Sequence, residues 1–165
     1  MTQAIHDKPA KNAPRRPPRR PPSLVDYTTA FLASDGEIVD WIKARVDARE
    51  FQRLVSRLST SEDRVYSLLG FGRSTIKRRL GNDDKLSQEE SERAIGLSQL
   101  VGLAETIVRE SGSTEPFDAA AWVGTWLEQP NPALGNATPA SYMDTVKGQQ
   151  LVRHILAMAQ GSAYA

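Results

Sequence analysis

The amino-acid sequence predicts an all-α fold. In several segments apolar residues recur every three or four positions, which places them on one face of a helix. Capping residues such as Ser, Thr and Pro stand before these segments, and Gly or Pro follows them. No evident strand lies between them. With 165 residues, 39% of them hydrophobic, the chain can form one domain or two small ones.

The composition excludes several classes of protein. There is no cysteine, and the two histidines, His6 and His154, lie far apart, so disulfides and metal sites are not expected. No apolar run approaches the ~20 residues needed to span a bilayer, and no signal peptide begins the chain. No nucleotide-binding or nucleophile motif is complete. We expect a cytoplasmic protein that is not an enzyme and needs no cofactor.

Charge is distributed unevenly along the chain. Residues 1–23 carry a net charge of +5, residues 24–42 carry −4, residues 43–79 carry +6 and residues 80–165 carry −6. A basic middle part and an acidic C-terminal part indicate two different partners.

A basic, proline-rich arm begins the chain. Residues 14–22 read Pro-Arg-Arg-Pro-Pro-Arg-Arg-Pro-Pro, and such a composition predicts that residues 1–23 are disordered or extended. The arm could contact DNA phosphates, serve as a solubilising tail, or act as a proline-rich ligand for another domain.

Three short helices are expected next, over residues 24–33, 36–46 and 47–58, with Ser23 as the cap of the first. Trp41 in the second is expected in the core. In the third, the apolar residues follow the helical spacing i, i+3, i+4 and i+7: Phe51, Leu54, Val55 and Leu58.

The basic middle part predicts a helix-turn-helix. A Ser/Thr-rich cap over residues 59–63 precedes a short helix, Gly70-Phe71-Gly72 forms a tight turn, and residues 73–80 form a second, basic helix. Ile76 and Leu80, four residues apart, would hold this helix to the core.

The second helix of such a motif enters the major groove of DNA. Near base edges we expect Arg73, Ser74, Thr75 and Lys77, and near phosphates Arg78 or Arg79. A helical protein without DNA contact remains the alternative, because the same layout occurs in many helical proteins.

The longest helix is expected from residue 87 to about residue 110. Ser87 and Glu90 form a capping box, and Glu89 and Glu92 favour the helix dipole, so a catalytic role for these carboxylates is not expected. Another helix, residues 117–127, carries Trp122 and Trp126 one turn apart, where a core or dimer contact is expected.

The C-terminal part contains a connector and a final helix. Residues 130–136 are rich in turn residues, Thr138 with Pro139 starts a short helix, and a second start follows at Thr145. Gly161 is placed to end the final helix. One face of that helix is expected to carry Leu151, Val152, Ile155, Leu156 and Ala159.

This pattern resembles the Xre/MbcA/ParS family of antitoxins over residues 36–165, most specifically in its C-terminal part. The matching features are Trp126-Leu127, Pro130-Asn131-Pro132, Leu134-Gly135, Thr138-Pro139, Asp144-Thr145, Gly148, Gly161 and the run Leu86–Arg93. The resemblance implies an Xre-like helix-turn-helix domain (24–110) followed by a toxin-binding domain (111–165). The disordered arm (1–23) lies outside the resemblance and is expected from its composition alone.

The resemblance also implies a function. Such an antitoxin binds and neutralises a RES-domain toxin that consumes NAD, and it represses its own operon as a DNA-bound homodimer. Toxin binding is then expected at Arg153, His154, Gly161, Ser162, Ala163, Tyr164 and Ala165, with the tail inserted into the NAD site. A stand-alone transcriptional regulator whose C-terminal helices dimerise, or a polar-localised or chromosome-linked adaptor, are the alternatives.

Overall fold

The structure, a computed structural model, describes residues 19–162 of the chain. These residues contain helices and one isolated β-bridge, between Asp47 and Lys85, so the all-α prediction is confirmed. The elements, with η for 3-10 helices, are α1 (Tyr27–Leu32), α2 (Asp35–Ala44), α3 (Ala48–Val55), α4 (Glu62–Leu68), α5 (Arg73–Gly81), α6 (Gln88–Glu110), α7 (Ala119–Leu127), η1 (Pro132–Leu134), η2 (Pro139–Tyr142) and α8 (Val146–Ser162).

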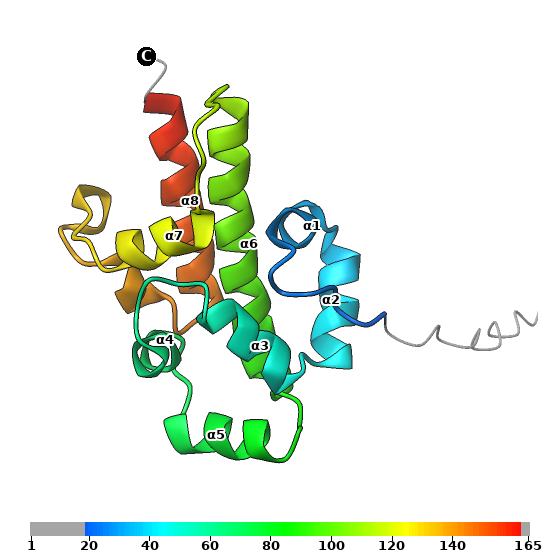
Figure 1. The fold of residues 1–165 in the computed structure, drawn as a ribbon. Helices are drawn as coiled ribbons and strands as arrows, with labels where there is room; N and C mark the ends of the chain where they lie inside the picture. Colours follow the sequence, from blue (N-terminus) through cyan, green and yellow to red (C-terminus); the bar gives the residue numbers. More distant parts are fainter. Residues whose placement is uncertain (1–18, 163–165) are drawn as a thin grey trace, which may run out of the picture.

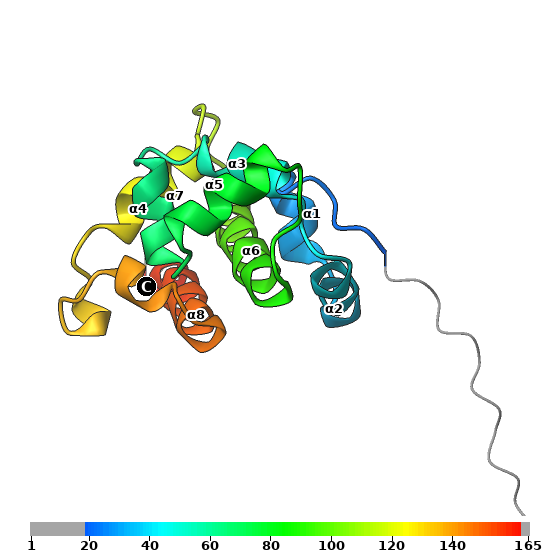
Figure 2. The same ribbon diagram turned by 90° about the horizontal axis from the view of Figure 1, so that it is seen from below.

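Helix α6 is the central element of the fold (Figure 1). Its 23 residues span about 35 Å, because an α-helix rises about 1.5 Å per residue. Helices α1 and α2 lie on one side of it, and α7 and α8 lie on the other (Figures 1 and 2). The predicted capping box is present: the Ser87 hydroxyl accepts from the Glu90 amide at 3.1 Å, and the Glu90 carboxylate accepts from the Ser87 amide at 2.7 Å.

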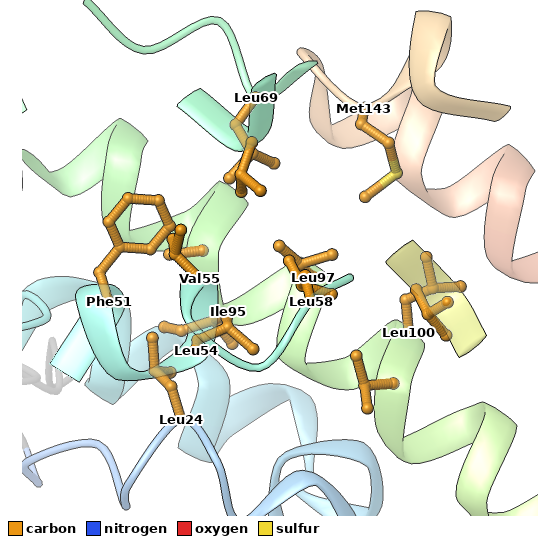
Figure 3. Close-up of a cluster of buried hydrophobic side chains, with 14 of the residues drawn as sticks. Leu24, Phe51, Leu54, Val55, Leu58, Leu69, Ile95, Leu97, Leu100 and Met143 are labelled. Atoms are coloured by element: carbon orange, nitrogen blue, oxygen red, sulfur yellow. The ribbon is translucent and has the colours of Figure 1, made fainter. Parts of the chain in front are cut away.

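One hydrophobic core joins the two halves of the chain. Phe51 of α3, Leu97 of α6 and Met143 before α8 are fully buried and belong to the same cluster (Figure 3). Trp41 is also buried, as expected. Because α6 contributes to this cluster along much of its length, it supports both the helix-turn-helix and the C-terminal helices.

The first helix begins later than predicted. Asp26, not Ser23, caps α1, and its carboxylate accepts from the Thr29 amide at 3.2 Å. The Ser23 hydroxyl instead donates to Glu50 of α3 at 2.9 Å, so a tertiary contact takes the group that was expected to cap the helix.

Gly102 allows α1 to lie directly against α6. A Cβ at this position would stand 2.1 Å from the Tyr27 carbonyl oxygen and 2.7 Å from the Phe31 Cβ. Gly102→Ala should therefore push α1 away and cost about 1–3 kcal/mol of unfolding free energy, the usual penalty for overpacking. Thermal and denaturant unfolding measure this loss. Gly36→Ala is the matched control, because nothing lies within 4 Å of that position; equal losses for both variants would contradict the packing described.

Candidate functional sites

The turn of the helix-turn-helix is fixed by backbone geometry and by a buried ring. Gly70 adopts a φ of +69°, a backbone conformation that residues other than glycine rarely adopt. The Phe71 amide donates to the Tyr66 carbonyl at 2.8 Å, and the Phe71 ring packs 5.2 Å from the ring of Phe51. These contacts fix the direction in which α5 leaves the turn.

Helix α5 lies at one end of the molecule, opposite the end of α8 (Figure 1). Ile76 is fully buried and Leu80 packs partly against the core, as expected for the inner face. The outer face carries five residues of the predicted DNA-contacting set. Thr75 is half-buried, and the other four are exposed: Arg73, Ser74, Lys77 and Arg78. The structure therefore brings five of the six predicted residues to one accessible surface.

The sixth residue, Arg79, differs from the sequence prediction. Its guanidinium donates to the Lys85 carbonyl at 2.6 Å and pairs with Glu90 at 3.2 Å, and its side chain is only 15% exposed. The loop after α5 folds back toward the start of α6, and Arg79 joins these segments. A phosphate contact for Arg79 conflicts with this place in the fold.

Arg73, by contrast, remains accessible to an anionic partner. It pairs with Asp63 of α4 at 2.7 Å, and the two side chains are 61% and 48% exposed. Exposed pairs of this kind contribute little to stability, so a stronger anionic partner can replace Asp63.

The connector between α7 and α8 is closed by its own hydrogen bonds. The Asn131 amide donates to the Ala137 carbonyl at 3.0 Å, and the Asn136 amide donates to the Asn131 carbonyl at 2.9 Å. Thr138 precedes η2, with Pro139 first in it, but the Thr138 hydroxyl makes no cap bond, contrary to expectation. The predicted start at Thr145 is confirmed, because its hydroxyl accepts from the Gly148 amide at 3.0 Å.

Gln149 anchors α8 to the rest of the fold. Its side chain is 3% exposed, and its amide nitrogen donates to the Arg93 carbonyl at 3.1 Å and the Met143 carbonyl at 3.0 Å. Gly96 of α6 leaves the space for it, since a Cβ there would stand 1.8 Å from the Gln149 oxygen. This role of Gln149 was not predicted from the sequence, where its signal is a polar residue next to the apolar face of α8.

Arg153, predicted at the edge of the toxin interface, lies half-buried against α6. It donates to the Gln99 side chain at 2.7 Å, and burial lowers the pKa of its guanidinium. His154, the next residue, is exposed. The structure therefore separates these two predicted residues: Arg153 supports α8, and His154 faces outward.

An exposed strip on α8 was not predicted. Leu151 and Met158 are 40% and 51% exposed, and His154 lies between them along the helix. Leu151 had been expected on the buried face, which is instead formed by Val152, Ile155 and Leu156. We call Leu151, His154 and Met158 the α8 strip.

The predicted tail lies only partly within the described residues. Helix α8 continues through Ser162, so the prediction that Gly161 ends it is wrong. A glycine inside a helix costs only about 1 kcal/mol relative to alanine, which the preceding turns can offset. Ala163, Tyr164 and Ala165 lie outside the described residues.

Two arginines add further connections between the helix-turn-helix part and the C-terminal helices. Arg64 of α4 donates to both carboxylate oxygens of Glu128 at 2.7 and 2.9 Å, and this bond raises the pKa of Arg64. Arg93 of α6 donates to the Asp144 carbonyl at 2.9 Å and stands 5.2 Å over the ring of Phe71. The turn before α5 and the segment before α8 are thus linked through one arginine.

Comparison with known proteins identifies both parts. Residues 39–99 match a family described as the antitoxin Xre-like helix-turn-helix domain. Residues 114–161 match the antitoxin Xre/MbcA/ParS C-terminal toxin-binding domain. The chain is also 37% identical over 139 residues to the "Prs ADP-ribosylating antitoxin" of Sphingobium sp. (strain YBL2), a match that covers 84% of this chain and 87% of the relative.

A helix-turn-helix joined to a toxin-binding domain defines the class of protein. The chain belongs to the Xre/MbcA/ParS family of antitoxins. Within the part of the chain that the structure describes, no group of three or more metal-ligating side chains is present, and no helix is long and apolar enough to cross a membrane.

Proposed function

We propose that this antitoxin neutralises a RES-domain toxin that consumes NAD, and that it does so by binding rather than by catalysis, without a cofactor. The α8 strip carries this proposal. It presents two exposed apolar side chains on a helix that Gln149 and Arg153 hold in place, within the segment that matches the toxin-binding domain. The name of the Sphingobium relative includes the term "ADP-ribosylating". Transfer of ADP-ribose from NAD is one NAD-consuming reaction.

The toxin-contacting set that we propose combines the α8 strip with the chain end, residues 161–165. The acidic residues of the C-terminal half, with a net charge of −6 over residues 80–165, would steer the two proteins together. Arg153 acts behind the interface by fixing α8 to α6.

Co-expression with the product of the neighbouring gene, which the proposal expects to be a RES-domain protein, tests the proposal. The two should co-purify as a stable complex, and the double variant Leu151→Gln with Met158→Gln should weaken it at least about tenfold, since central apolar contacts dominate interface energies. Leu32→Gln is the matched control, because Leu32 is 67% exposed on α1, outside the toxin-binding match. Equal toxin binding by the strip variant and the control would contradict the assignment of the α8 strip to the toxin interface.

We also propose that α5 binds operator DNA, so that the antitoxin represses its own operon as a homodimer that reads paired half-sites. Arg73→Ala should cost about 1–3 kcal/mol if Arg73 contacts a guanine, and Lys77→Ala should flatten the salt dependence if Lys77 meets a phosphate. Fluorescence anisotropy with promoter fragments at several salt concentrations measures both effects.

Arg53→Ala is the control for the DNA experiment, because Arg53 is equally exposed but lies on α3. We expect this variant to bind DNA with unchanged affinity. Absence of DNA binding at low salt, with and without toxin, would refute the operator proposal, and a monomer at all concentrations in light scattering would refute the homodimer.

A further inference from the structure

We propose that the Pro/Arg segment of one copy, residues 14–22, docks on a row of aromatic side chains on α7 and just before it in a second copy. This aromatic row consists of Phe117, Trp122 and Trp126. It lies on a different helix from the α8 strip. The proposal therefore stands apart from the toxin contacts proposed above and gives the proline-rich arm a binding partner.

The aromatic row is an exposed and regular surface. The rings of Phe117 and Trp122 are 6.0 Å apart, and those of Trp122 and Trp126 are stacked at 5.8 Å with an interplanar angle of 12°. Phe117 and Trp122 are 37% and 40% exposed, while Trp126 packs partly against the core. Aromatic surfaces of this kind are what proline-rich ligands in the polyproline II conformation bind.

The spacing of the rings fits such a ligand. Polyproline II advances about 3.1 Å per residue, so two residues cover about 6.2 Å, close to each step of the row. The arm alternates pairs of prolines with pairs of arginines. Each proline pair can thus lie on one ring while a neighbouring guanidinium reaches the face of the next ring or an acid beside it.

A pocket at the Phe117 end supplies the acids and an unused hydroxyl. Tyr27, Arg57, Glu105, Phe117 and Asp118 are among its lining residues, and its volume is about 450 Å³. The Tyr27 side chain is nine-tenths buried, and its hydroxyl has no partner within the described residues. Burial is the main cause that raises the pKa of Tyr27 to about 12. The charge of Arg57 lowers this pKa, and the charges of Glu105 and Asp118 raise it further. Two carboxylates outnumber the one arginine, so the pocket suits a guanidinium.

The charges of the two segments are complementary. Residues 110–130, which contain the aromatic row, hold four acidic residues and no basic one, whereas residues 14–22 hold four arginines and no acid. Attraction between segments of opposite charge favours and orients their association.

The docked arm must belong to a second copy, because helices of its own molecule separate the arm from the aromatic row. Arg19 lines a pocket on α2, and α1 and α6 stand between α2 and α7 in both views (Figures 1 and 2). Residues 14–18 extend at most about 18 Å from Arg19. Each helix in between is about 10 Å wide with its side chains. Reciprocal docking would join two copies.

Tryptophan side-chain resonances test the proposal. The receptor is the full chain with Arg15, Arg16, Arg19 and Arg20 all changed to Gln, so that its own arm does not compete. A synthetic peptide of residues 11–23 should shift the indole N–H signals of Trp122 and Trp126. The signal of Trp41, which is 6% exposed, should stay unchanged as an internal control.

Trp122→Gln and Glu105→Gln, introduced separately into the receptor, should each weaken peptide binding about tenfold, in line with loss of a partly desolvated aromatic or ionic contact. Leu32→Gln should leave it unchanged. Sedimentation equilibrium of the unmodified chain should likewise show weaker self-association after Trp122→Gln. No indole shift in a large excess of peptide, or equal binding by the Trp122→Gln, Glu105→Gln and Leu32→Gln receptors, overturns the proposal.

Discussion

Removal of residues 161–165 should leave the antitoxin bound to its toxin but restore NAD loss to the rate of the free toxin. The deletion keeps α8 through Gln160, and with it the α8 strip and the Gln149 anchor. It removes the segment that we propose to enter the NAD site. Affinity and inhibition should therefore separate in this variant.

Two assays check this prediction: co-purification for the complex, and NAD consumption for inhibition. Deletion of residues 1–5, at the other end of the chain, is the size-matched control and should inhibit like the full chain. Complete inhibition by the chain lacking residues 161–165 would show that the helical surface blocks the toxin by itself and that the tail is not the inhibitor.

Leu97→Ala should destabilise the whole described fold in one cooperative transition. Leu97 is fully buried in the core that joins the helix-turn-helix to the C-terminal helices. Truncation of such a leucine costs about 2–5 kcal/mol, because the removed methyl groups leave a cavity. Loss of α6 packing should reduce DNA binding and toxin binding together.

Circular dichroism and intrinsic fluorescence during thermal unfolding measure this effect. Leu32→Ala is the control, since Leu32 is exposed and surface substitutions usually change stability by less than about 0.5 kcal/mol. Two separate unfolding steps, of which only one moves in Leu97→Ala, would contradict a core shared through α6.

Local features of the fold were predictable from the sequence because their causes are local. The capping box of Ser87 and Glu90 involves residues three positions apart, and the Thr145 start involves a similar span. The turn at Gly70 and the buried position of Ile76 likewise follow from neighbouring residues. The family resemblance then supplied the order of the two parts.

Features that depend on distant partners could not be predicted. Arg79 looked like the other basic residues of its helix, and only the return of the loop toward Glu90 distinguishes it. Leu151 fitted the apolar pattern of α8, but the orientation of α8 on α6 is set by Gln149 and Gly96, which are 53 positions apart. The exposed α8 strip is a consequence of that orientation.

Direct binding of the antitoxin to an NAD-consuming RES-domain toxin is the core of the function that we propose. The most direct test is the rate of NAD loss catalysed by the purified toxin as increasing amounts of the full chain are added. We expect the rate to fall in proportion to the added antitoxin and to vanish once the toxin is saturated. A rate of NAD loss that is unchanged in the presence of excess antitoxin would contradict it.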